Sequence, residues 1–206
     1  SRAPGLVPSW RVIELRSADG SRPVPSRAGE TVALDDGARV ELVARYASGA
    51  RLALARFRRL GGSVEEFLER HGTPIRYGYV EKAWPLSSYQ TVFATTPGSA
   101  EMPSAARPFS TELLARLLAR GVLLAPITLH AGLSSPERRE TPIPEWVEVS
   151  EVTARLVRAH RRWGGRIIAV GTTVVRALES AAVVDGDARA WSGWTGLVVE
   201  PERRLK

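Results

Sequence analysis

The spacing of apolar residues changes once along the chain, and this change limits what the chain can fold into. Over the first 57 residues apolar and polar positions alternate with a period of two, which is typical of half-buried antiparallel strands. The alternating runs are WRVIELR (10–16), ARVELVARY (38–46) and ARLALARF (50–57). From Ser63 onward helical spacing alternates with short apolar runs. The sequence therefore predicts a small antiparallel β-barrel-like domain over 1–60 and an α/β domain over 61–206.

Helices and strands alternate in the predicted α/β domain. Its first helix starts at Ser63, which forms a capping box with Glu66, and ends at Gly72. The later elements are helices over 110–121, 150–163 and 172–182, and strands over 122–130, 166–171 and 193–200. Ser150 is the predicted N-cap of the helix over 150–163, and Gly164 is its predicted stop. This order predicts a parallel or mixed sheet, or a barrel-like one, with covering helices. The segment over 73–110 has little periodicity and is predicted to be a long loop. Loops of this length inside a compact domain are more often functional than not.

The composition excludes several kinds of site. The chain has no cysteine and only three histidines, which lie far apart. Thiolate catalysis, iron–sulfur clusters and cysteine zinc sites are excluded, and we expect no metal. No apolar run approaches the ~20 residues of a membrane-spanning helix, so we expect no membrane partner. The absence of cysteine fits a cytoplasmic enzyme.

The charge of the chain is basic and is concentrated in one stretch. The formal net charge is +7, and residues 155–166 (RLVRAHRRWGGR) contain five arginines and one histidine. Such density favours a polyanionic partner, because each neutralised phosphate releases counterions. An arginine-rich proteome would give the same excess without any such partner.

Two strand ends carry candidate site residues, because ligands of α/β sheets gather beyond the carboxyl ends of strands. His130 ends the run VLLAPITLH, and Gly171-Thr172-Thr173 follows the run RIIAV. The threonines can cap the next helix, whose free N–H groups suit a carboxylate or phosphate. On that helix Arg176 and Glu179 share a face. From these residues alone, a structural histidine, ordinary capping and a solvated or structural ion pair are the commoner explanations.

Four stretches occur together in one order: 89–110, 121–133, 145–146 and 166–180. Together they resemble the S-adenosylmethionine:tRNA ribosyltransferase-isomerase family of queuosine biosynthesis. The β-rich segment before them resembles the inserted barrel domain of that family. Pro108 and the pair Ile143-Pro144 stand where the family pattern has histidines, and the family's C-terminal motifs are not in this chain. We therefore expect a diverged, truncated member.

The resemblance implies an enzyme that modifies tRNA. In the family the ribosyl part of S-adenosylmethionine passes to a 7-aminomethyl-7-deazaguanine base in the tRNA and is isomerised, while adenine and methionine leave. The implied partners are tRNA and S-adenosylmethionine, the latter as a substrate, with no metal. The resemblance assigns catalysis to His130 and Glu145. It assigns substrate or S-adenosylmethionine binding to Tyr89, Gln90, Thr91, Ser104, Thr128, Gly171, Thr172, Thr173, Arg176 and Glu179.

Two other functions fit the same sequence. One is a diverged paralogue that binds S-adenosylmethionine or another nucleoside and acts on a different substrate. The other is a basic RNA-binding module without catalysis. Binding of S-adenosylmethionine separates the module from both enzymes, and release of adenine from precursor tRNA separates the two enzymes from each other.

Overall fold

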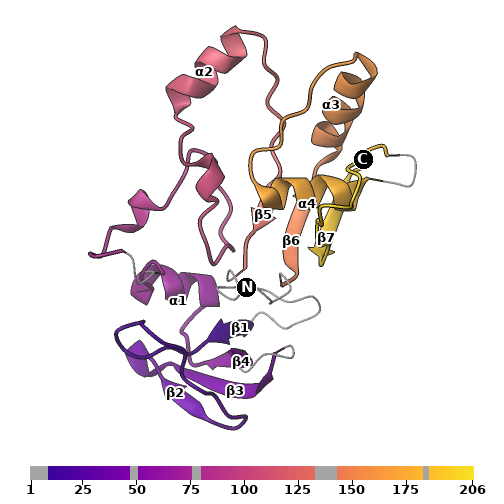
Figure 1. The fold of residues 1–206 in the computed structure, drawn as a ribbon. Helices are drawn as coiled ribbons and strands as arrows, with labels where there is room; N and C mark the ends of the chain where they lie inside the picture. The colour runs from indigo at the N-terminus through magenta and orange to yellow at the C-terminus, as the bar shows by residue number, and fades with distance from the viewer. Residues whose placement is uncertain (1–8, 47–50, 76–79, 133–142, 183–185) are drawn as a thin grey trace. The chain divides into compact units, whose positions relative to one another are not determined.

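The structure is a computed structural model that describes residues 9–46, 51–75, 80–132, 143–182 and 186–206. The chain divides into two compact units, Ser1–Tyr89 and Gln90–Lys206. Figure 1 shows the helices and strands of each unit. The sequence predicts a domain boundary after residue 60, ahead of the first α-helix, whereas the compact unit also takes in that helix.

The first unit is built on a four-stranded antiparallel sheet in the order β1-β4-β3-β2. Its strands are β1 (Trp10–Glu14), β2 (Thr31–Ala33), β3 (Arg39–Arg45) and β4 (Leu52–Arg58), with the 3-10 turn η1 (Asp35–Gly37) before β3. The antiparallel sheet predicted from the period-two runs is confirmed. The strand order leaves β1 and β2 at the two edges, so it does not confirm a barrel.

One face of this sheet and the start of helix α1 (Val64–His71) share a core. The buried side chains of the core belong to Val40, Leu42, Ala53, Ala55, Phe57 and Val64. Helix α1 begins at Ser63, whose side chain accepts from the Glu66 N–H at 3.1 Å, while Glu66 accepts from the Ser63 N–H at 2.8 Å. The predicted capping box is confirmed. The 3-10 turn η2 (Leu86–Ser88) follows before the unit ends.

The second unit contains a three-stranded sheet in the order β5-β6-β7, with helix α4 (Thr172–Ala181) in contact with all three strands (Figure 1). The strands are β5 (Thr128–His130), β6 (Glu145–Val149) and β7 (Trp191–Thr195). Their core consists of Val147, Val149, Ala154, Ala177 and Ala181. Helix α4 therefore covers one face of the sheet.

Three further elements complete the second unit. They are the 3-10 turn η3 (Ser104–Ala106), α2 (Thr111–Ala119) and α3 (Glu151–Arg162). Ser110 and Ser150 cap α2 and α3 with hydrogen bonds of 3.1 Å each. The predicted cap at Ser150 and the predicted stop at Gly164, where φ is +74°, are confirmed. None of the described helices is both long and apolar enough to cross a membrane.

The predicted α/β mixture of helices and strands is confirmed, but both pairs of strands in the second sheet are antiparallel. The predicted strand over 166–171 has no regular secondary structure, and the strand over 122–130 shrinks to Thr128–His130. A strand needs a partner, and within the described residues these runs leave Ile168 71% and Leu123 53% exposed. Because no strand forms between α3 and α4, these two helices follow each other and connect β6 to its antiparallel neighbour β7.

Candidate functional site

On the face opposite α4, the sheet of the second unit carries polar and aromatic side chains in a row. His130 pairs with Trp146 across the strands, and Trp146 pairs with Trp194. Directly opposed residues of antiparallel strands lie on the same face. The two indole rings meet edge to face, 5.9 Å apart at 71°. Thr128 lies two residues before His130 on β5 and therefore joins them on what we call the His130 face.

A loop from the long segment before α2 fixes the position of His130. The Ser99 hydroxyl donates to the Leu129 carbonyl at 3.1 Å and accepts from the Ala131 N–H at 3.3 Å. The Ala100 N–H donates to the Ala131 carbonyl at 2.8 Å. These three hydrogen bonds hold the loop along β5. They bind it to Leu129 and Ala131, the two neighbours of His130 in the sequence.

Gly98 places its backbone directly against the imidazole of His130. A Cβ atom added at Gly98 would lie 2.6 Å from the Nδ1 atom of His130, and the φ of Gly98 is +142°. Both facts require glycine, because any side chain would push the ring away and strain the backbone. The Nδ1 atom is shielded from solvent. The loop therefore determines how the imidazole is presented.

The covered face of the same sheet holds a buried ion pair. Arg176, on α4, donates through Nη1 to the Glu145 carboxylate, and the two side chains are 11% and 13% exposed. Arg176 also donates from Nε to the Leu197 carbonyl at 2.8 Å and from Nη2 to the Thr195 carbonyl at 3.1 Å. This arginine ties α4 to β6 and to the end of β7.

Burial raises the pKa of the Glu145 carboxyl above its usual value. The Arg176 guanidinium and a hydrogen bond from the Gly132 N–H both lower the pKa, and the Glu101 charge raises it slightly, but burial prevails. Glu145 is therefore an anchor of the fold, and burial is the strongest influence on its carboxyl.

Glu179 has partners other than the one its spacing suggested. Its carboxylate accepts from the backbone N–H of Lys206 at 2.9 Å and from Arg203 Nε at 3.4 Å. Its side chain is only 5% exposed. Although Arg176 and Glu179 lie three residues apart on α4, Glu179 binds the C-terminal segment and Arg176 binds Glu145.

The N-terminus of α4 has no side-chain cap, so the predicted capping by threonine is wrong. The cap position is taken by Gly171, whose φ is +107°, and Thr172 and Thr173 are the first helical residues. A glycine at that φ turns the chain directly into the helix, which leaves no cap position for a threonine. Ala105 of η3 lies 3.6 Å from the point where a Cβ of Gly171 would stand. The structure thus brings the turn that begins at Ser104 beside the start of α4.

The predicted residues Tyr89, Gln90 and Thr91 lie at the division between the two compact units. Tyr89 ends η2, and Gln90 is exposed. Thr91 makes local contacts, since its hydroxyl accepts from the Phe93 N–H at 3.3 Å and its carbonyl from the Ala94 N–H at 3.0 Å. Tyr89 closes the turn that begins at Leu86, and Thr91 opens the next one, so their role in binding stays a prediction.

The predicted residues therefore do not form one site. In the second unit Thr128 and His130 lie on the face opposite α4, Glu145 and Arg176 on the face that α4 covers, Ser104 and Gly171 at the start of α4, and Glu179 against the C-terminal segment. Among the described residues no three histidine or acidic side chains are grouped to hold a metal ion.

The segments that meet around this sheet are those of one known family. The family model described as "Queuosine biosynthesis protein" matches residues 13–206. The chain belongs to the queuosine biosynthesis protein family.

Curated relatives in this family are named S-adenosylmethionine:tRNA ribosyltransferase-isomerase. One from Pelotomaculum thermopropionicum is 41% identical over 155 residues, which cover 70% of this chain and 45% of the relative. One from Symbiobacterium thermophilum is 39% identical over 190 residues, covering 88% and 55%. One from Geobacter sulfurreducens is 35% identical over 215 aligned residues, covering 100% and 60%. The chain spans about half the length of the curated relatives it matches.

The residues that position His130 were not among those predicted from the sequence. Gly98 and Ser99 lie inside the first family stretch, and Trp146 stands next to Glu145, but none of them was assigned a role. The glycine in the loop before α2 was the available signal, since glycine marks places of close backbone approach. The pairing of Trp146 with Trp194 depends on the register of strands far apart in sequence.

Proposed function

We propose that this chain has the activity of an S-adenosylmethionine:tRNA ribosyltransferase-isomerase and binds its substrates at the His130 face. The observation that carries the proposal is the junction at His130, where residues 98–100 of one family stretch are hydrogen-bonded to residues 129–131 of the next. Hydrogen bonds across some thirty residues of sequence hold one imidazole on the face opposite α4. Membership of the family and the names of its curated relatives support the reaction.

In the proposed reaction the ribosyl group of S-adenosylmethionine passes to a 7-aminomethyl-7-deazaguanine base of tRNA. The carbon next to the sulfonium must lose a proton to form an ylide, and adenine and methionine must leave. We assign the proton transfer to His130, because imidazole is a common general acid and base and this one lies beside Trp146 on the face opposite α4. Glu145 is the second candidate, because burial raises its pKa.

The start of α4 is the proposed place for the carboxylate of the methionine part. The helix has ten residues and no side-chain cap, so the N–H groups of its first turn and its positive end can meet an anion. Thr172 and Thr173 add hydroxyl groups at this end, and the turn of Ser104 lies beside it. Thr128 and the aromatic rings of the His130 face would contact the nucleoside part. We retain Tyr89, Gln90, Thr91, Arg176 and Glu179 as predicted binding residues. The tRNA partner would place this reaction in the cytoplasm.

The test is to incubate the 206-residue chain with S-adenosylmethionine and tRNA that carries the precursor base, and to measure released adenine by chromatography. We expect adenine release from the unaltered chain and its loss in His130→Gln, with an unchanged melting temperature. A matched control is Glu148→Gln, because Glu148 is exposed, lies directly opposite Thr128 on the same face of the sheet and has no assigned role.

Calorimetry with S-adenosylmethionine distinguishes the other functions. Binding without adenine release would favour a paralogue with another substrate and contradict the proposed reaction. Binding of RNA without binding of S-adenosylmethionine would favour a non-catalytic module. Adenine release that survives His130→Gln would remove His130 from the reaction.

A further inference from the structure

Helix α3 ends in a cluster of arginines around an exposed tryptophan, and none of these residues belongs to the site described above. Residues 151–166 contain five arginines against one glutamate. We define the basic α3 surface as the side chains of Arg155, Arg158, Arg162, Trp163, Arg166 and Arg189.

The arginines of α3 share one side of the helix. Arg155, Arg158 and Arg162 are spaced by three and four residues, so they follow one another along one face. The side chain of Arg155 is 73% exposed, and it contacts Glu151 at 2.7 Å. Arg162 and Arg166 are exposed and form no ion pair with any described residue. Their charges are available to a partner.

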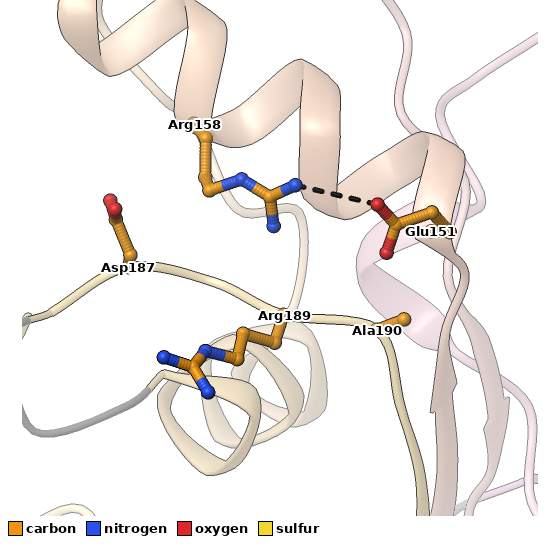
Figure 2. A pocket seen from close by; sticks show the side chains of 5 residues that line it. All are labelled: Glu151, Arg158, Asp187, Arg189 and Ala190. Atoms are coloured by element: carbon orange, nitrogen blue, oxygen red, sulfur yellow. Dashed lines mark hydrogen bonds and ion pairs between the residues drawn. The ribbon is translucent and has the colours of Figure 1, made fainter.

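A shallow hollow continues this surface toward the loop before β7. Figure 2 shows Arg158 of α3 and Arg189 of that loop in the hollow, with Glu151, Asp187 and Ala190 completing its lining. Arg158 donates to the Ala188 carbonyl at 2.6 Å, which fixes the loop to the helix. Within the hollow the Glu151 carboxylate accepts from Arg155 at 2.7 Å and from Arg158 at 3.5 Å, and Asp187 is the second acidic lining residue. Five arginines against these two carboxylates leave the surface with a positive formal charge.

Trp163 stands out because large aromatic side chains are mostly buried, whereas its side chain is 72% exposed. Its position is defined by the end of the helix. The Gly165 N–H donates to the His160 carbonyl and the Gly164 N–H to the Arg161 carbonyl, both at 2.9 Å, with Gly164 at a φ of +74°. The His160 ring meets the indole edge to face at 6.3 Å. The indole of Trp163 is therefore exposed at the end of α3, next to the arginines and in contact with the His160 ring.

We infer that the basic α3 surface binds single-stranded RNA, with arginines on phosphates and Trp163 stacked on one unpaired base. Arginine-lined surfaces that carry an exposed aromatic ring suit unpaired nucleotides, because any base can stack and each phosphate contact releases counterions. The inference rests on the proposed function for its ligand, a tRNA, whose loops supply unpaired bases. It assigns the contact to a surface separate from the His130 face.

Fluorescence anisotropy with two labelled RNAs, a hairpin with an unpaired loop and a fully paired duplex of equal length, tests this at several salt concentrations. We expect Trp163→Ala to weaken hairpin binding about tenfold and to leave duplex binding unchanged, with Trp163→Phe restoring most of the loss. Arg162→Gln should reduce the slope of log affinity against log salt by about 0.7–0.9 for both RNAs. Exposed residues of the first unit, Trp84 and Arg45, provide the controls Trp84→Ala and Arg45→Gln.

Equal effects of Trp163→Ala on hairpin and duplex, or effects no larger than those of the controls, would overturn the inference. Unchanged RNA binding with altered self-association in the ultracentrifuge would also overturn it, and would show that Trp163 makes a protein contact. Adenine release is measured separately. If RNA binding depends on this surface but no adenine is released, only the proposed reaction is contradicted. If adenine is released but neither variant affects RNA binding, only the proposed RNA-binding surface is contradicted.

Discussion

Replacing Arg176 with methionine removes the cation from the buried ion pair while keeping much of the side-chain volume. Glu145 would then be a buried carboxylate with no cation, because its side chain is 13% exposed and water has little access to it. The carbonyls of Thr195 and Leu197 would lose their donor at the same time. We therefore expect the second unit to lose stability well beyond the effect of a surface change.

The size of this loss follows from the burial of the pair. Breaking a buried ion pair by removing one partner costs about 3–5 kcal/mol, and solvent screening reduces this little when both side chains are nearly nine-tenths buried. For a unit of this size the melting temperature should fall by roughly 10–20 °C. In the double variant Arg176→Met with Glu145→Gln no charge is buried alone, so it should recover part of the loss.

The loss should also depend on pH. Burial raises the pKa of Glu145 in the folded state, and removing Arg176 takes away an influence that lowers it. A carboxyl whose folded pKa lies above its unfolded pKa binds more protons when folded, so stability falls as pH rises through that interval. The defect of Arg176→Met should therefore shrink in mild acid and grow toward neutral pH, and Glu145→Gln should remove this dependence.

Urea denaturation followed by tryptophan fluorescence measures these effects, because Trp146, Trp191 and Trp194 all lie in the sheet that α4 covers. A control, Arg155→Met, removes an arginine from an exposed pair and should cost no more than about 1 kcal/mol. A cost of Arg176→Met below about 1 kcal/mol at every pH would contradict the burial of the pair. Additive free-energy costs of Arg176→Met and Glu145→Gln in the double variant would contradict the coupling between the two residues.

Three smaller changes test other contacts. Gly98→Ala should displace the His130 ring and strain the backbone at φ +142°. We expect a clear loss of S-adenosylmethionine affinity in calorimetry with only a small fall in melting temperature. Unchanged binding would show that this loop is not part of the binding site. Ser63→Ala removes the side-chain acceptor of the capping box and should cost the first unit about 1 kcal/mol in urea denaturation, whereas an unaltered midpoint would mean the cap contributes nothing. Glu179→Gln should free the C-terminal segment near Lys206 to limited proteolysis, and an unchanged digestion pattern would contradict that anchoring role.

Local signals along the chain were sufficient for the helices. The caps at Ser63 and Ser150 depend on residues within one turn, and each forms as its short sequence signature predicts. The runs over 122–127 and 166–171 had an equally clear apolar pattern and formed no strand. A strand requires a neighbour elsewhere in the chain, and the pattern of one segment carries no information on whether that neighbour is present.

The division of the site between two faces could not be read from the sequence. His130 and Glu145 were predicted as catalytic partners, yet the register of β5 and β6 puts them on opposite faces of the sheet. Strand register decides this, because a shift of one residue exchanges the two faces. In the same way the partner of Arg176 lies thirty-one positions away in Glu145 rather than one helical turn away in Glu179.

The sequence alone determined the family stretches, the helix caps, the two-part change in periodicity and the basic segment that became the end of α3. These features are local or are counted directly from residues. Only the tertiary structure decided that Gly98 packs on His130, that α4 covers one face of the sheet, and that Trp163 is exposed. Each of these depends on contacts between distant segments, and such contacts form only when burial and pairing across the whole unit are satisfied together.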